Sequence, residues 1–200
     1  MLTRIHLALG MGATGAITWR RLRARKAGII RHKGKKLKDI LEAHEKFHKG
    51  HAGGERADLV GANLSGQDLK KSDLTGANMV GCNLQKADLR GSKLSFADLS
   101  RANLRKADLR NCDFTETKLE GADLSEADLS GTELFRGDLR SAKLHKTILR
   151  GTVLRQAILQ GADFSGSDLA LASFRELDLT GVKMDGADLK DAVVRDNRKS

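Results

Sequence analysis

Apolar residues recur at every fifth position over most of this chain. Each position from Leu59 to Val194 in steps of five holds Leu, Met, Phe or Val, which makes twenty-eight consecutive units without an insertion or deletion. The slot two residues earlier holds a small residue in nearly every unit, with Gln67, Leu177 and Val182 as the exceptions. A period of five fits neither an α-helix nor a long strand, so each unit is predicted to be a short extended segment followed by a corner. Repetition at so short a fixed period is typical of a solenoid.

We expect both restricted columns, the large apolar one and the small one, to point into the solenoid. Glycine is the last residue of many units, for example Gly61 and Gly76, where it supplies the backbone freedom that a corner needs. Cys82 and Cys112 occupy the small column, so the sequence predicts buried and reduced thiols.

A helical pattern precedes the repeats. In the run KKLKDILEAHEKFHK, the apolar residues Leu37, Ile40, Leu41 and Phe47 form one stripe on a helix. Solenoids expose their core at both ends unless another element covers it. We therefore predict that residues 35–52 form an amphipathic helix that caps the first turn of the solenoid.

The segments ADLSEADLSGTEL and ANLRKADLRNCDF resemble the pentapeptide-repeat family, and the resemblance spans about seven tenths of the chain. That family folds as a right-handed quadrilateral β-helix with four units to a coil. The resemblance therefore implies an all-β solenoid of about seven coils, with repeats over residues 57–196 in a domain of residues 53–200. At one β-ladder spacing per coil the rod would be roughly 34 Å long.

Positive charge is concentrated ahead of the repeats. Residues 1–56 hold 14 Lys and Arg against 4 Asp and Glu, whereas residues 57–200 hold 22 of each kind. The net charge of +10 therefore belongs to the N-terminal extension.

The N-terminal segment, residues 1–34, begins apolar and turns basic. Its apolar run from Ile5 to Trp19 would span roughly 22 Å as a helix, less than the ~30 Å hydrocarbon core, so a membrane crossing is marginal. Positive charge after the apolar run disfavours an export signal and places the solenoid in the cytoplasm, whether the segment spans the membrane or lies on an anionic membrane surface. The basic residues in question are Arg20, Arg21, Arg23, Arg25 and Lys26.

Two other interpretations of this segment remain open. The absence of acidic residues before Asp39 is also typical of a mitochondrial presequence, which would make the protein mitochondrial in a eukaryote. Alternatively, the basic run is an arm that binds nucleic acid, although Trp19 is the one aromatic residue beside it.

His44 and His48 lie one helical turn apart in a sequence that matches H-E-x-x-H, and His51 follows three residues later. This is the spacing of zinc ligands, with Glu45 placed as a general base. Only some 56 residues precede the repeats, which is too few for the domain that a metalloprotease builds around its substrate. We predict no catalytic residue and no cofactor, with metal binding by the three histidines as a minor alternative.

Two outward features are predicted on the solenoid. If every fourth unit lies on one side, an acidic column that includes Asp88 and Asp108 runs beside a basic column that includes Arg90 and Arg110, and such a ladder neutralises itself. Apolar residues replace the usual Asp or Asn in three consecutive units, which predicts a contact surface around the fifth and sixth coils and at the C-terminal coil. The residues of this predicted surface are Ile148, Val153, Ile158, Leu171, Val193 and Val194.

These features favour a non-catalytic protein-interaction scaffold that is tethered to a membrane through its N-terminus. The C-terminal coil is expected to form a homodimer, to bind a protein partner or to fray. The resemblance implies an alternative, because some pentapeptide-repeat proteins protect topoisomerases from quinolones by imitating DNA with an acidic rod. The balance of acidic and basic residues in residues 57–200 disfavours that alternative, and no set of residues indicates an enzyme.

Overall fold

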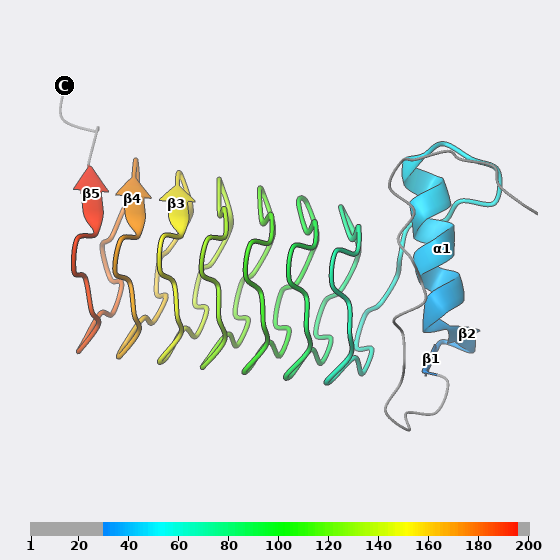
Figure 1. Ribbon diagram of the computed structural model, residues 1–200, viewed down its shortest axis with the longest axis horizontal. Helices are drawn as coiled ribbons and strands as arrows, with labels where there is room; N and C mark the ends of the chain where they lie inside the picture. The colour runs from blue at the N-terminus through cyan, green and yellow to red at the C-terminus, as the bar shows by residue number, and fades with distance from the viewer. Residues whose placement is uncertain (1–29, 196–200) are drawn as a thin grey trace, which may run out of the picture.

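The computed structural model describes residues 30–195 and shows a rod of stacked coils with a helix at its N-terminal end (Figure 1). The described chain opens with a short antiparallel hairpin of β1 (Arg31–His32) and β2 (Lys35–Lys36). The hairpin leads directly into α1 (Leu37–His48). Three parallel strands lie on one side of the last coils, and they are β3 (Val153–Arg155), β4 (Ser173–Arg175) and β5 (Val193–Arg195).

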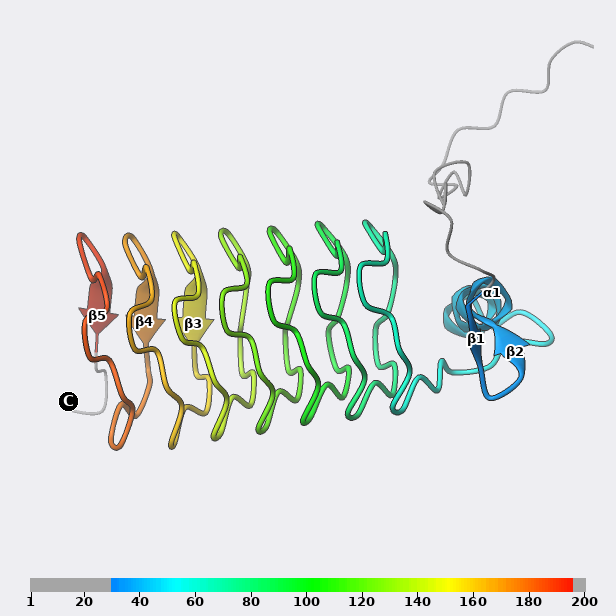
Figure 2. The ribbon, with the colours of Figure 1, turned by 90° about the horizontal axis from the view of Figure 1, so that it is seen from below.

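Each turn of the rod takes up twenty residues. Parallel β-bridges join positions twenty residues apart, from Asp58 with Asn78 to Asp168 with Asp188. β3, β4 and β5 keep this register, since Val153 pairs with Ser173. Twenty residues are four units of five, so a coil has four sides and equivalent positions of every fourth unit form a column. Figure 2 shows the coils stacked in line along the rod.

Backbone hydrogen bonds between coils hold the columns in line. Leu59 N–H donates to the Asn78 carbonyl at 2.7 Å, and Asn78 N–H donates to the Ala57 carbonyl at 2.9 Å. Each coil is thereby bonded to its neighbour on several sides, which satisfies backbone groups that burial would otherwise leave unpaired.

The core is a ladder of the two restricted columns. Leu64, Leu104 and Leu144 are completely buried, and Phe114 and Phe164 fit the same large column. Polar residues of the small column donate to the backbone of the preceding coil. The pairs are Ser92 Oγ with the Leu69 carbonyl at 2.8 Å, Cys112 Sγ with Leu89 at 2.9 Å and Thr117 Oγ1 with Leu94 at 2.6 Å.

Both cysteines are free and buried. Desolvation raises the pKa of the Cys82 and Cys112 thiols to about 12, so they stay protonated and unreactive.

The corners are tight turns that accept many residue types. Ala62 N–H donates to the Leu59 carbonyl at 3.0 Å, and Gly61, the third residue of this four-residue turn, has a φ of +67°. A positive φ at the third residue is the mark of a type II turn. Of the 27 described residues at this position, 12 are glycine and 15 are not, and the latter include Phe96 and Leu171. Glycine therefore supplies the corner conformation where the sequence predicts it, and other residue types adopt the same conformation at the remaining corners.

Candidate functional site

Asp and Asn recur before the central Leu because their side chains brace the corner that follows. Ser100 N–H donates to Asp98 Oδ1 at 3.1 Å, Gln85 N–H donates to Asn83 Oδ1 at 3.1 Å, and the same contact recurs around the rod. This is the contact that short carboxylate and amide side chains make in turns. The acidic side chains of the motif thus mostly accept hydrogen bonds from the protein's own backbone.

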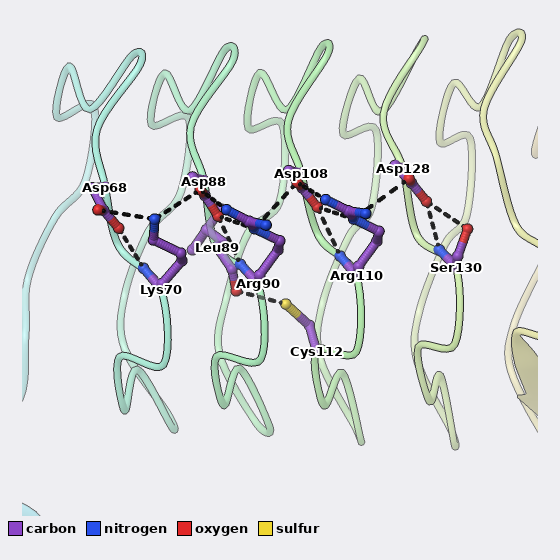
Figure 3. A network of polar contacts seen from close by, with 10 residues as sticks. All are labelled: Asp68, Lys70, Asp88, Leu89, Arg90, Asp108, Arg110, Cys112, Asp128 and Ser130. Carbon is purple, nitrogen blue, oxygen red and sulfur yellow. Dashed lines mark hydrogen bonds and ion pairs between the residues drawn. The ribbon is translucent and has the colours of Figure 1, made fainter.

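One side of the rod carries a continuous row of alternating charges (Figure 3). Lys70 Nζ lies 3.1 Å from Asp68 and 3.2 Å from Asp88. Arg90 then bridges Asp88 at 2.7 Å and Asp108 at 3.3 Å. The row continues through Arg110, which bridges Asp108 at 2.7 Å and Asp128 at 3.7 Å. We call this row the charge ladder.

The charge ladder holds Asp88 and Asp108 ionised. The hydrogen bond from Arg90 lowers the pKa of Asp88, and the hydrogen bond from Arg110 lowers the pKa of Asp108. Asp88 and Asp108 each face a cation from their own coil and one from the preceding coil, so this part of the rod presents little net electrostatic field to a ligand.

The charge ladder ends at Asp128, where Ser130 takes the place of the next cation and donates to Asp128 Oδ1 at 2.6 Å. One coil further on, Ile148 replaces the aspartate and begins the predicted apolar surface. Ile148, Val153 and Ile158 are all exposed. Because consecutive units turn a corner, these three residues lie on three successive sides of the rod rather than in one patch.

The structure does bring some of the predicted contact residues together. Val153 and Val193 are the outward residues of β3 and β5, with Ser173 of β4 between them. Leu171 lies at the corner just before β4 and is 60% exposed. We call Val153, Leu171, Ser173 and Val193 the apolar corner.

Aromatic and basic side chains border the apolar corner. The guanidinium carbon of Arg136 lies 4.9 Å and that of Arg155 lies 5.8 Å from the centre of the Phe135 ring. Arg155 also lies 3.3 Å from Glu176. The sequence reasoning missed this cluster, although a comparison of outward residues every twenty positions would have revealed it.

At the N-terminal end of the rod, α1 packs most of its apolar stripe against the first coil, but Phe47 of the predicted stripe is exposed. Leu37, Ile40 and Leu41 are buried in one cluster with the leucines of the rod. Ion pairs hold the preceding hairpin, since Lys33 lies 2.5 Å from Asp58 and Lys35 lies 2.5 Å from Glu55. A cavity of about 410 Å³ remains between the hairpin, α1 and the rod, and these paired charges line it.

The two histidines of the H-E-x-x-H sequence contact the first coil. His44 is completely buried and its Nδ1 accepts the Ala57 amide at 3.0 Å, while His48 Nε2 donates to the Thr75 carbonyl at 2.7 Å. Burial is the main cause that lowers the pKa of His44 to about 4, and His48 adds to it. His51 is exposed. Within residues 30–195 no three His, Cys, Asp or Glu side chains are grouped so as to hold a metal ion.

The C-terminal end shows inward-facing residues that are exposed. Leu189 and Val194 belong to the large apolar column, yet they are 43% and 58% exposed, whereas Leu169 and Phe174 one coil earlier are at most 1% exposed. Among residues 30–195, nothing covers this end of the core.

Residues 1–29 of the predicted membrane or nucleic-acid segment, with the basic run from Arg20 to Lys26, lie outside the described residues. Its last residues, 30–34, lead into and form part of the hairpin of β1 and β2. Within the part that the structure describes, no helix is both long enough and apolar enough to cross a membrane.

A family model described as pentapeptide repeats matches the chain in eight copies, over residues 57–95, 92–131, 138–175 and 157–196. No curated protein matches the sequence.

Several solved structures are similar to this chain. HetL, a pentapeptide repeat protein involved in heterocyst differentiation regulation in the cyanobacterium Nostoc sp. strain PCC 7120, is 38% identical over 68% of this chain and 65% of its own, with a TM-score of 0.48. The chain thus spans less than two thirds of HetL. QnrB1, a plasmid-mediated fluoroquinolone resistance protein, is 22% identical over 70% of this chain and 84% of its own, with a TM-score of 0.36. A pentapeptide repeat protein of the Arabidopsis thaliana thylakoid lumen is 29% identical over 57% of this chain and 66% of its own, with a TM-score of 0.30.

Proposed function

The chain belongs to the pentapeptide-repeat family, and from this premise we propose that it is a non-catalytic scaffold that binds a protein partner along its rod. Membership of the family implies a right-handed quadrilateral β-helix, as the resemblance indicated. Such a rod fixes outward side chains in straight columns one ladder spacing apart, which makes it suited to presenting a surface.

The apolar corner is the observation that carries this proposal. Elsewhere on the rod the outward position before the central residue holds mostly charged or amide residues, many of which bond a turn amide. In β3, β4 and β5 it holds Val153, Ser173 and Val193 instead. Leu171 keeps a bulky apolar side chain at a corner where its φ is +61°, a conformation that glycine would adopt with less strain. Apolar residues retained at such exposed positions favour a contact surface.

Capture of a partner by the full chain tests the scaffold. We expect Val153→Asp combined with Leu171→Asp to remove the captured partner, because two buried carboxylates would oppose docking. Gln160→Asp, on another side of the rod, is the control and should retain it. If both variants capture the same proteins as the unchanged chain, the apolar corner is not the docking surface.

Two further roles belong to this proposal. The first is that α1 caps the first coil, which its buried Leu37, Ile40 and Leu41 support. The second is that the N-terminal segment tethers the protein to an anionic membrane from the cytoplasmic side, and only its sequence supports this role. DNA mimicry is the weaker alternative, because Arg90 and Arg110 neutralise the aspartates that would imitate phosphates.

A further inference from the structure

The two ends of the rod present complementary halves of the same interior, one covered by α1 and the other open. At the first coil Leu59, Leu64 and Leu74 are completely buried, and α1 lies at that end (Figures 1 and 2). At the last coil Leu189 and Val194 of the same column are largely open. A first coil placed beyond the last would bury both sets.

The backbone pattern is complementary as well. Inside the rod Leu169 N–H donates forward to the Asp188 carbonyl at 2.7 Å, and Asp188 N–H donates back to the Ser167 carbonyl at 2.8 Å. By the same register, the N–H of Leu189 faces the open end of the last coil. The N–H of Asp68 faces the opposite end, at the first coil. A further coil of this repeat, stacked on either end, would therefore continue the apolar column and would pair with the backbone donors and acceptors of that end.

α1 takes the place of such a coil with fewer bonds. In the interior, Phe96 N–H donates to the Thr115 carbonyl at 2.9 Å. At the first coil the equivalent carbonyl, that of Thr75, accepts from the His48 side chain of α1 instead, and the Ala57 amide donates to His44 Nδ1 of α1. A cap held by a few side chains is easier to displace than a coil held by a backbone ladder.

We propose that α1 is a displaceable cap, and that mild acid releases it so that the first coil stacks end to end on the C-terminal coil of a second copy of this chain. The inference rests on the capping role of α1. A second copy is the occupant because its last coil continues the twenty-residue register.

His44 is the group that responds to acid. Its Nδ1 accepts the Ala57 amide, and protonation would turn this acceptor into a donor that faces another donor. His48 on the same helix and Arg56 at the start of the rod oppose a positive charge on His44, whereas Asp73 and the Thr75 backbone favour it. In this tautomer the buried Nε2 already carries the ring's proton, and no hydrogen-bond partner for it lies among the described residues. A second proton must therefore go onto Nδ1 and break the bond to Ala57.

The size of the response follows from linkage. Burial lowers the pKa of His44 from 6.5 to about 4 in the capped state, and release restores the ordinary value. Between pH 8 and pH 5 release then becomes favoured by about thirtyfold. Glu55 and Asp58 stay ionised in this range, since Lys35 and Lys33 lower their pKa values.

The test uses the full chain in sedimentation velocity at pH 7.5 and pH 5.0, with hydrogen exchange of residues 37–48 measured in parallel. We expect monomers at pH 7.5, and linear multimers with faster exchange in α1 at pH 5.0. Val194→Asp should prevent the multimers while α1 is still released, with Leu189→Asp as a second variant. Ile158→Asp, on a side of the rod, is the matched control and should assemble normally.

His44→Asn supplies the second arm, because the Asn Oδ1 can accept the Ala57 amide and does not titrate. This variant should behave alike at the two pH values. Acid release of α1 without multimers overturns the proposal, as do multimers that survive both end variants. A dimer at pH 7.5 that Val194→Asp abolishes indicates tail-to-tail pairing and overturns it too. If α1 already exchanges freely at pH 7.5, the capping role itself is wrong.

Discussion

At the residue scale, the small column sets how much the rod tolerates. Ala107 is only 2% exposed and lies between the buried Leu104 and Leu109. Ala107→Leu adds three carbons where coils stack closely, and such overpacking typically costs about 1–3 kcal/mol. We expect a lower melting temperature in thermal unfolding followed by circular dichroism. Ala170→Leu serves as a comparison variant, because Ala170 is buried but lies outside this column. Equal melting temperatures for Ala107→Leu and the unchanged chain would show that the small column can accommodate a larger side chain.

Phe96 illustrates the opposite situation, a residue that strains its own corner. Its φ is +60° and its side chain is 56% exposed, so it packs little while it holds a left-handed backbone. The left-handed region costs a non-glycine residue about 1–2 kcal/mol. A glycine avoids this strain, but the greater conformational entropy of glycine in the unfolded chain offsets about 0.5–1 kcal/mol of the gain.

Phe96→Gly should therefore raise the free energy of unfolding by up to about 1 kcal/mol in denaturant titration. Phe96→Ala removes the ring but keeps the strain, so it should not stabilise the protein. A more stable alanine variant than glycine variant would show that the ring, rather than the backbone, is unfavourable.

The inward residues were predictable from the sequence, and the role of the outward acids was not. Size restriction in two columns identified Leu104 and Ala107 as interior residues because a core limits volume. The sequence alone gave acids such as Asp98 no role beyond surface charge. In the structure Asp98 Oδ1 accepts a turn amide. That role depends on the position of the corner, and the sequence pattern locates the corner only to within one residue.

At the scale of the element, α1 links acid to stability. His44 is neutral and buried, and its pKa is lowered from 6.5 to about 4. Below pH 6.5 the unfolded chain takes up a proton that the folded chain refuses, so stability is lost as the pH falls towards 4. The slope is at most about 1.4 kcal/mol per pH unit.

Chemical denaturation between pH 7 and pH 4.5 measures this loss. We expect it to shrink in His44→Asn and to persist in His51→Asn, because His51 is exposed. A pH profile that is identical in the two variants would contradict the assignment to His44.

The helix of residues 35–52 was predictable in kind, and the structure gives its bounds as Leu37–His48. Its H-E-x-x-H sequence was ambiguous, because i, i+4 spacing places two imidazoles on one helical face whether they bind a metal or contact a neighbouring element. What the sequence lacked was the rod beside that face, which supplies the Ala57 amide and the Thr75 carbonyl as partners.

At the scale of the whole molecule, the fourfold coil explains why the apolar surface differs from its prediction. Three consecutive apolar units look adjacent in the sequence, but each corner turns the chain to a new side. Residues twenty apart, such as Val153 and Ser173, are the true neighbours. The period of five is visible directly in the sequence, whereas the number of sides entered only through the resemblance to a family.

The N-terminal segment allows a test of the membrane tether. The full chain should co-sediment with anionic liposomes, and deletion of residues 5–19 should weaken this strongly, because surface binding needs buried apolar area as well as charge. The basic run alone adds up to about 1 kcal/mol per Lys or Arg near the surface. Neutral liposomes are the control. If the deletion has no effect while the basic run binds nucleic acid with a steep salt dependence, the tether is excluded.

The twenty-residue register also restricts how the gene encoding this rod can change in length. Loss of residues 97–116 would remove one whole turn and leave every later residue on its original side, so that each column would lose one member and keep its order. Loss of residues 97–101 alone would keep every local motif intact and yet rotate all that follows by a quarter turn, which would set Arg110 in a foreign column. Insertions and deletions that keep the outward columns in register must therefore come in multiples of four motifs.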